Sequence, residues 1–212
     1  REAEKAILTQ SRALTLTAES AREYMSGRID AGVVRSFEEL AAEESEEDLI
    51  SAVPIIAAIR VMERNADAAG YTFRVPKVSP RNPDNEPDPT ELAALERIKL
   101  EGLDELVVRE EDQIRYFRPI TLTQECMLCH GDPAGSTDPV GGTREGWNAG
   151  EIHGAFEIIG SLEAAQAVQR AAIGKIGGVT GVVLLFVGIV VVFVTKLITG
   201  SLRQFVVDFE TA

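Results

Sequence analysis

The chain has 212 residues, of which 34 are acidic and 21 are basic, so its formal net charge is -13 at pH 7. This charge excludes nucleic acid as an expected partner, and a hydrophobic fraction of 45% excludes global disorder. The two cysteines, Cys126 and Cys129, are too close in sequence to brace a fold, so we expect their role to be chemical.

The N-terminal part of the sequence favours helices. Residues 1–30 place apolar side chains at helical spacing among charged ones, which predicts an amphipathic helix. Residues 38–48 are mostly acidic and are interpreted as a solvated face or a flexible crossing. Pro54 can open a further helix that runs to Ala69 and is closed by Gly70.

The central part of the sequence predicts a sheet. Residues 71–76 alternate like a short strand, and the proline-rich stretch 79–89 is expected to be an ordered loop or a tether. Thr90 is expected to cap a helix over residues 91–101 that ends at Gly102. The remaining predicted strands are 105–109 and 113–119, which form a hairpin, and 152–159. This order predicts an α+β fold with an antiparallel sheet and flanking helices.

The C-terminal part predicts a membrane anchor. A helix capped by Ser161 is expected to continue into Ile176–Thr195, a segment without charge that would span about 30 Å. A buried core helix is the alternative, but the segment lacks a polar stripe. Basic residues flank both ends equally, so they do not predict the orientation. Glycines that favour a homodimer or a place in a membrane complex are Gly174, Gly177, Gly178, Gly181 and Gly188.

Residues 126–130 read Cys-Met-Leu-Cys-His, and Cys-x-x-Cys-His is the attachment signature of c-type haem. Two thiols can add to the two vinyl groups of one porphyrin, and the adjacent imidazole is then placed under the iron. We therefore predict one covalent haem c, attached at Cys126 and Cys129, with His130 as metal ligand. A zinc site would need two more ligands, and only His153 remains among Cys and His. A thioredoxin-like pair would open a helix, whereas a loop is expected after His130.

Other side chains are candidates for the haem pocket. Arginine and tyrosine donors can hold the porphyrin propionates, because a guanidinium fork matches a carboxylate, and an aromatic ring can pack on the porphyrin face. Each basic candidate has an ordinary surface charge as its alternative interpretation. The candidates are Arg74, Arg81, Arg115, Arg118 and Tyr116 for the propionates, and Trp147 and Phe156 for packing.

The sixth ligand of the iron is expected to decide the function. Met25, Met62 and His153 are the side-chain candidates, and water is the alternative. Methionine at helical spacing is also ordinary core filler. A weakly held site would bind a small gas or switch its ligand with redox state, whereas a firm Met or His ligand would favour electron transfer.

Seven segments together carry a resemblance to a known family: AVPIIAA (52–58), YTFRVPK (71–77), RNPDNEPD (81–88), RYFRPI (115–120), CMLCHGDP (126–133), EGW (145–147) and GEIHGAF (150–156). Residues from about 10 to 165 resemble the periplasmic c-type haem sensor domain with a PAS-like fold, which precedes the signalling modules of bacterial chemotaxis receptors and histidine kinases. The resemblance implies that Cys126 and Cys129 hold the haem, that His130 is the proximal ligand, and that the distal ligand either is a Met or Cys from the N-terminal helix or is replaced by water. Met25 is its candidate, because the chain has no third cysteine.

The sequence is therefore expected to comprise an N-terminal helix (1–35), a PAS-like haem domain (36–165), a stalk and transmembrane helix (166–200) and a tail (201–212). The tail resembles the opening of a HAMP linker, with Ser201 where that linker usually has proline. Haem is attached outside the bacterial cytoplasmic membrane, so we expect a periplasmic haem domain and a cytoplasmic tail. The sequence begins without methionine, which indicates an N-terminus that is processed or cut from a longer chain.

The leading functional hypothesis is a membrane-anchored sensor of redox state or of a small gas that relays its signal through the transmembrane helix. The alternative is a tethered monohaem cytochrome that carries electrons to a redox partner, whose approach the acidic surface could steer. An enzyme such as a haem peroxidase is not expected, because no distal His and Arg pair occurs at a recognisable spacing.

Overall fold

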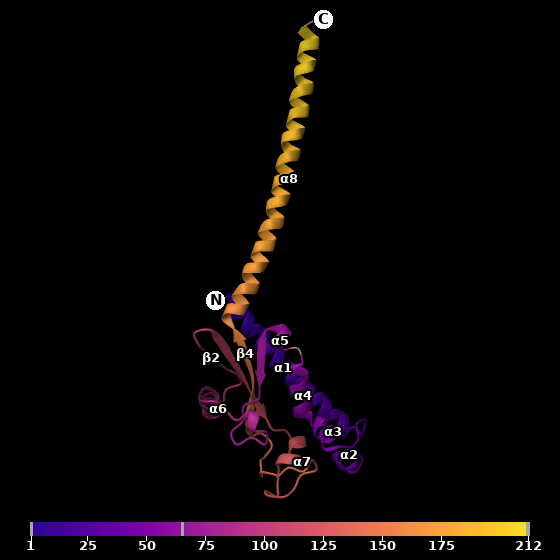
Figure 1. Cartoon of the computed structure of the whole chain (residues 1–212), viewed down its shortest axis with the longest axis vertical. Coiled ribbons are helices and arrows are strands. Elements are labelled where there is room, and N and C mark those ends of the chain that lie inside the picture. The colour runs from indigo at the N-terminus through magenta and orange to yellow at the C-terminus, as the bar shows by residue number, and fades with distance from the viewer. Residues whose placement is uncertain (1, 65, 211–212) are drawn as a thin grey trace. The chain divides into compact units, whose positions relative to one another are not determined.

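The computed structural model describes residues 2–64 and 66–210, which divide into two compact units with a boundary between Ala165 and Gln166. The first unit is built on a four-stranded antiparallel sheet with the strand order β1-β4-β3-β2. Figure 1 labels β2 and β4 of this sheet. The strands are β1 (Tyr71–Arg74), β2 (Leu106–Arg109), β3 (Gln113–Thr121) and β4 (Ile152–Ser161). The predicted α+β fold class and the predicted hairpin of β2 and β3 are confirmed.

The long N-terminal helix α1 (Glu2–Asp30) is confirmed and packs on one face of the sheet. The helix approaches β4 closely at Gly160, where a Cβ atom would lie 2.6 Å from Cγ2 of Ile7. The buried face of α1 includes polar residues, and the buried hydroxyl of Thr15 donates a hydrogen bond to the carbonyl oxygen of Ser11. The buried residues recur every three or four positions, as an amphipathic helix requires: Ala3, Ile7, Ser11, Thr15, Ala18 and Arg22.

The acidic segment forms two short helices, α2 (Phe37–Glu43) and α3 (Glu46–Ser51), so the expectation of a flexible crossing is wrong. Ser36 and Ser45 cap these helices, and Phe37, Leu40 and Leu49 form a small apolar cluster beneath them. Acidic side chains of the segment whose burial is described are exposed, as predicted for a solvated face. The capping serines therefore start two helices in a segment whose acidic composition alone does not indicate a helix.

The helix predicted over residues 54–69 is divided into α4 (Pro54–Glu63) and α5 (Ala66–Ala69). Pro54 occupies the first turn of α4, as predicted, and Gly70 adopts a positive φ of 71° immediately before β1. Met62, near the end of α4, is 2% exposed and belongs to the core that α1 and α4 form with the sheet.

The opposite face of the sheet packs against α6 (Pro89–Glu101). The residue that caps this helix is Asp88 rather than the predicted Thr90, because the Asp88 carboxylate accepts from the backbone of Glu91 and Pro89 fills the first turn. The predicted end at Gly102 is confirmed by its left-handed conformation, with φ 64°. Residues 79–88, which include the 3-10 turn η1 (Pro83–Asn85), are an ordered loop.

The second unit belongs to one continuous helix, α8 (Leu162–Glu210), which begins directly after β4. Its predicted cap is confirmed, since the Ser161 hydroxyl accepts from the amide of Ala164 at 3.2 Å. The span Leu162–Gly200 has a mean hydropathy of 2.8 and is long and apolar enough to cross a membrane. The helix continues into the predicted tail as far as Glu210, and residues 1, 211 and 212 of the predicted parts lie outside the described residues.

Candidate functional site

The Cys-x-x-Cys-His segment folds into one helical turn after β3. The 3-10 turn η2 (Gln124–Cys126) leads directly into α7 (Met127–His130). Cys129 and His130 follow Cys126 by three and four positions, so both are neighbours of Cys126 on one side of the helical turn. Gly131 ends the turn, and a Cβ atom there would lie 2.8 Å from the carbonyl oxygen of Met127. The loop that was predicted after His130 is confirmed and extends to the start of β4.

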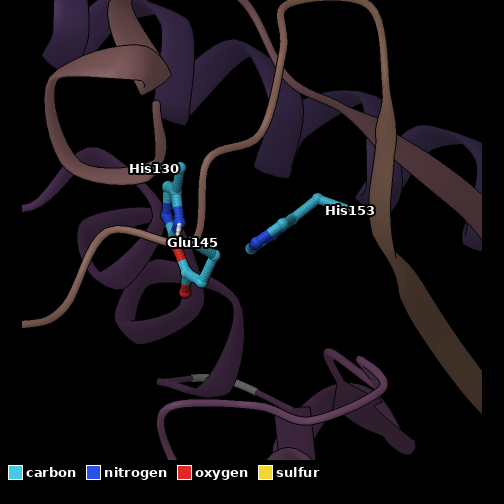
Figure 2. Close-up of side chains that lie close together, drawn as sticks. All are labelled: His130, Glu145 and His153. Atoms are coloured by element: carbon cyan, nitrogen blue, oxygen red, sulfur yellow. Dashed lines mark hydrogen bonds and ion pairs between the residues drawn. The ribbon is translucent and has the colours of Figure 1, made fainter. Parts of the chain in front are cut away.

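His130 is hydrogen-bonded to a carboxylate from the loop before β4. Its Nδ1 lies 2.8 Å from Oε2 of Glu145, and the two side chains face each other in Figure 2. Burial disfavours the charge of Glu145, but hydrogen bonds from Arg81 and His130 outweigh this and lower its pKa to about 2. Burial lowers the pKa of His130, although Glu145 opposes the shift. The pair is therefore a neutral imidazole that donates Nδ1–H to a carboxylate and leaves Nε2 for another ligand.

Arg81 connects the proline-rich loop to this site. Its Nε donates to Glu145 at 2.8 Å, its Nη1 to Asp138 at 2.5 Å, and its Nη2 to the carbonyl oxygen of Cys129 at 2.7 Å and of Thr143 at 2.9 Å. These bonds occupy all three guanidinium nitrogens. In this arrangement Arg81, one of the predicted propionate ligands, holds the Cys-x-x-Cys-His turn and the following loop together.

His153, at the start of β4, packs against both the pentapeptide and Trp147. Its ring centre lies 4.4 Å from that of His130 and 5.2 Å from that of Trp147 (Figure 2 shows the two histidines). Burial, assisted by the charge of Lys77, lowers the pKa of His153 to about 3, so the ring is neutral. Its Nε2 is buried without a hydrogen-bond partner. The structure therefore brings the predicted residues His130, Trp147 and His153 together.

Three predicted propionate ligands have carboxylate partners on other elements. Arg74 pairs with the buried Glu91 of α6, the Tyr116 hydroxyl donates to Glu105 at 2.8 Å, and Arg118 donates to Glu19 of α1 at 3.0 Å. Arg115 likewise forms ion pairs with Asp88 and Glu157 on the face of the sheet that packs against α6. The contacts described for these four side chains connect them to α1, α6, β4 and the neighbouring loops and not to the pentapeptide.

The predicted methionine ligands occupy different surroundings. Met62 lies in the apolar core beneath α4. Met25 is half-buried on α1, one turn after Arg22, whose Nη1 lies 3.7 Å from the Cys126 sulfur and 3.5 Å from the carbonyl oxygen of Thr121. Arg22 therefore reaches the Cys-x-x-Cys-His turn from α1, and Met25 follows it one turn later on the same helix.

The alternative chemistries considered for the cysteines receive little support from their surroundings. Burial and the nearby Asp138 raise the pKa of Cys129 to about 11, whereas a reactive dithiol requires a depressed pKa. For the zinc alternative, Glu145 is a possible ligand in addition to His130 and His153, since ligand atoms of these three residues lie within 4.8 Å of one another. However, Glu145 also bonds Arg81 and lies 3.6 Å from Lys77, and these positive charges oppose a bound cation.

Sequence reasoning missed Glu145 and Lys77 as members of the site. Both belong to segments that carried the family resemblance, 145–147 and 71–77, but neither has a spacing that marks it as a partner of His130. Glu145 reaches His130 only because the loop between α7 and β4 closes back on itself, with the Trp147 amide donating to the His130 carbonyl oxygen at 2.8 Å.

The fold and the site define an α+β domain that carries a Cys-x-x-Cys-His turn and precedes a helix able to cross a membrane. The family model described as Tll0287-like matches residues 1–161, and the chain belongs to this family. The solved structure of the cyanobacterial heme-protein Tll0287 is 21% identical, with a TM-score of 0.48, and the match covers 68% of this chain and 89% of that chain. A search of curated proteins found no match.

Proposed function

We propose that this chain is a membrane-anchored c-type haem protein. The observation that carries the proposal is the attachment turn, which presents Cys126, Cys129 and His130 on one face while Glu145 holds Nδ1 of the imidazole. The side chains fit the group, because two thiols can form thioethers and the free Nε2 can bind iron. Membership of a family that includes a protein described as a heme-protein supports the same assignment.

Bound haem would supply an iron that exchanges one electron and binds small ligands. The chain's own residues would then divide the work of holding it. Cys126 and Cys129 attach the group, His130 binds the metal, and Glu145 keeps the imidazole in the tautomer that exposes Nε2. His153 restricts the rotation of the His130 ring by packing against it, and Trp147 in turn packs against His153.

Met25 is the distal ligand that the geometry supports best. The rings of His130 and His153 pack against each other with their centres 4.4 Å apart, so we assign His153 a packing role beside the iron ligand. Met62 is enclosed in the core, whereas Met25 follows on α1 one turn after Arg22, whose Nη1 lies 3.7 Å from the Cys126 sulfur.

The function that we propose is sensing of redox state or of a small gas at the iron. The supporting observation is the path of β4, which begins at Ile152 beside His153, crosses the middle of the sheet and is followed directly by α8. A ligand or redox change that alters contacts at His153 would shift the conformational balance of this strand, and the helix that continues it is the one suited to a membrane.

We place the haem unit in the periplasm of a bacterium and the end of α8 in the cytoplasm, because covalent attachment takes place outside the cytoplasmic membrane. The second candidate is a tethered monohaem cytochrome, which the net charge of -13 favours, since an acidic surface attracts a basic redox partner. Neither role requires an enzymatic activity of this chain.

Three measurements test these proposals. Haem staining of the denatured chain should be positive, and a Cys126→Ser, Cys129→Ser double variant should lose the stain; an unstained wild-type chain refutes the haem assignment. Absorption spectra of the ferric and ferrous protein then separate the two roles. A spectrum that changes with CO or NO supports the sensor, whereas a six-coordinate spectrum in both states that ignores these gases supports the cytochrome.

A further inference from the structure

Three side chains form a hydrogen-bonded series that ends on His130. Glu145 accepts from Arg81 through both carboxylate oxygens, with Nε to Oε1 at 2.8 Å and Nη2 to Oε2 at 3.0 Å, while Oε2 also faces Nδ1 of His130 at 2.8 Å. Haem attachment through two thiols and one imidazole does not itself require this series. Its members come from three separate parts of the chain, so the fold must hold them in place.

Several features show that Arg81 is built into the structure rather than being an isolated surface charge. Its partner Asp138 has a fully buried side chain and also accepts from the amides of Val140 and Gly142. Gly142 leaves the space that the guanidinium needs, because a Cβ atom there would lie 2.6 Å from Nη1 of Arg81 and 2.7 Å from Oδ2 of Asp138. Arg81, itself held by Asp138, therefore fixes the orientation of the Glu145 carboxylate.

We propose that Glu145, clamped by Arg81, is a positioning residue that orients the His130 imidazole and lowers the reduction potential of the iron. The inference rests on the proposed function, because it requires His130 to be an iron ligand. A carboxylate that accepts Nδ1–H increases the electron density at Nε2, which stabilises ferric iron more than ferrous iron. Arg81 limits this effect, because its bidentate pairing neutralises part of the carboxylate charge.

The test is a spectroelectrochemical titration of the full-length holoprotein in detergent. Glu145→Gln keeps a hydrogen-bond acceptor but removes the charge, so it should shift the ferric-to-ferrous equilibrium toward ferrous iron about tenfold, which is about 59 mV for one electron. Arg81→Gln should shift it in the opposite direction, because the carboxylate is then less neutralised. The control is Glu151→Gln, whose carboxylate bonds Asn148 in the same loop and has no contact with His130.

A second readout reports the strength of the hydrogen bond, because the amide oxygen of glutamine is a weaker acceptor than a carboxylate. In the wild-type holoprotein the Nδ1 proton of His130, observed by NMR, should exchange slowly with solvent, and it should exchange at least tenfold faster in Glu145→Gln. An unchanged potential and an unchanged exchange rate in a haem-loaded Glu145→Gln variant would overturn the inference while leaving the proposed function intact.

The remaining outcomes also decide the question. If Glu145→Gln takes up no haem, the wild-type proton settles it: a slowly exchanging Nδ1 proton supports the positioning role, and a rapidly exchanging or missing one overturns it. A wild-type chain without covalent haem would overturn the proposed function and this inference together, and haem staining identifies that case before any titration.

Discussion

The buried carboxyl group of Glu157 should make this protein less stable as the pH rises above neutrality. Glu157 lies on β4 facing α6 and is fully buried; its Oε1 accepts from Arg115 at 2.6 Å, and its Oε2 has no hydrogen-bond partner. Arg74 lies 3.9 Å from Oε2, while Asp88 and Glu110 compete for Arg115. Burial, and then the neighbouring carboxylate of Glu91, raise the pKa of Glu157 to about 8.

The sign of the effect follows from proton binding. Between the unfolded pKa of about 4.3 and the folded pKa of about 8, the folded state binds one proton more than the unfolded state. The stabilisation is therefore complete below the unfolded pKa and is lost as the pH rises through the folded pKa. The free energy of unfolding should fall by about 1.4 kcal/mol per pH unit at most, and by roughly 1 kcal/mol between about pH 6.5 and pH 7.5.

The assay compares wild type with Glu157→Gln, which replaces the protonated carboxyl by a neutral amide of the same shape. Urea denaturation of the holoprotein in detergent can be followed by the fluorescence of Trp147, the single tryptophan. The lowered pKa values of His130 and His153 add an opposite slope, which fades about one pH unit above the unfolded pKa of about 6.5, and the comparison with Glu157→Gln cancels it because both proteins share these histidines.

The difference in unfolding free energy between the two proteins isolates Glu157, because all other groups are shared. That difference should change by roughly 1 kcal/mol per pH unit up to about pH 8. Glu96→Gln, a change of an exposed carboxylate on α6, is the charge control and should leave the slope of wild type unaltered. A flat difference between wild type and Glu157→Gln across this range would show that Glu157 is ionised in the folded protein.

Three further changes test the site and the packing. Met25→Ala should alter the ferric absorption spectrum. Met62→Ala should lower the free energy of unfolding by about 2–5 kcal/mol and leave the spectrum unchanged. A spectrum that changes in Met62→Ala but not in Met25→Ala would assign the distal ligand to Met62. Gly160→Ala should lower the free energy of unfolding in urea by about 1–3 kcal/mol, because its Cβ would overlap Ile7. In an Ile7→Ala background the same change should cost less, and additive losses in the double variant would contradict the close contact. Asp88→Ala should cost about 1–2 kcal/mol by removing the cap of α6, with the exposed Asp84→Ala as the unaffected control, and an equal loss in both would contradict the capping role.

Several elements were predictable because their signals are local. The periodicity of residues 1–30 predicted α1, and alternation of apolar and polar residues located the strands. Two expectations failed, one of them in part, where a short-range signal competed with composition. The acidic run at 38–48 forms the solvated face that was one interpretation, but it is not the flexible crossing that was the other, because serine caps and three apolar side chains order it. Thr90 was chosen as a cap, although Asp88 followed by Pro89 is the stronger signal.

Of the site, only the residues that are adjacent in sequence were predictable. Cys126, Cys129 and His130 are adjacent in sequence, so their spacing alone indicated attachment of a porphyrin. The propionate candidates Arg74, Tyr116 and Arg118 were chosen by residue type, and residue type does not tell which carboxylate a guanidinium or hydroxyl will meet. In the folded chain each of them faces Glu91, Glu105 or Glu19 respectively.

The sequence by itself determined the helices α1 and α6, the strands and the apolar length of α8, because each depends on residues within a few positions of one another. Only the tertiary structure decided that Glu145 binds His130, that Arg81 reaches the carbonyl of Cys129 and that Glu157 lies beside Glu91. The physical reason is that charged side chains form these contacts across sheet register and loop closure, which bring together residues far apart in the chain.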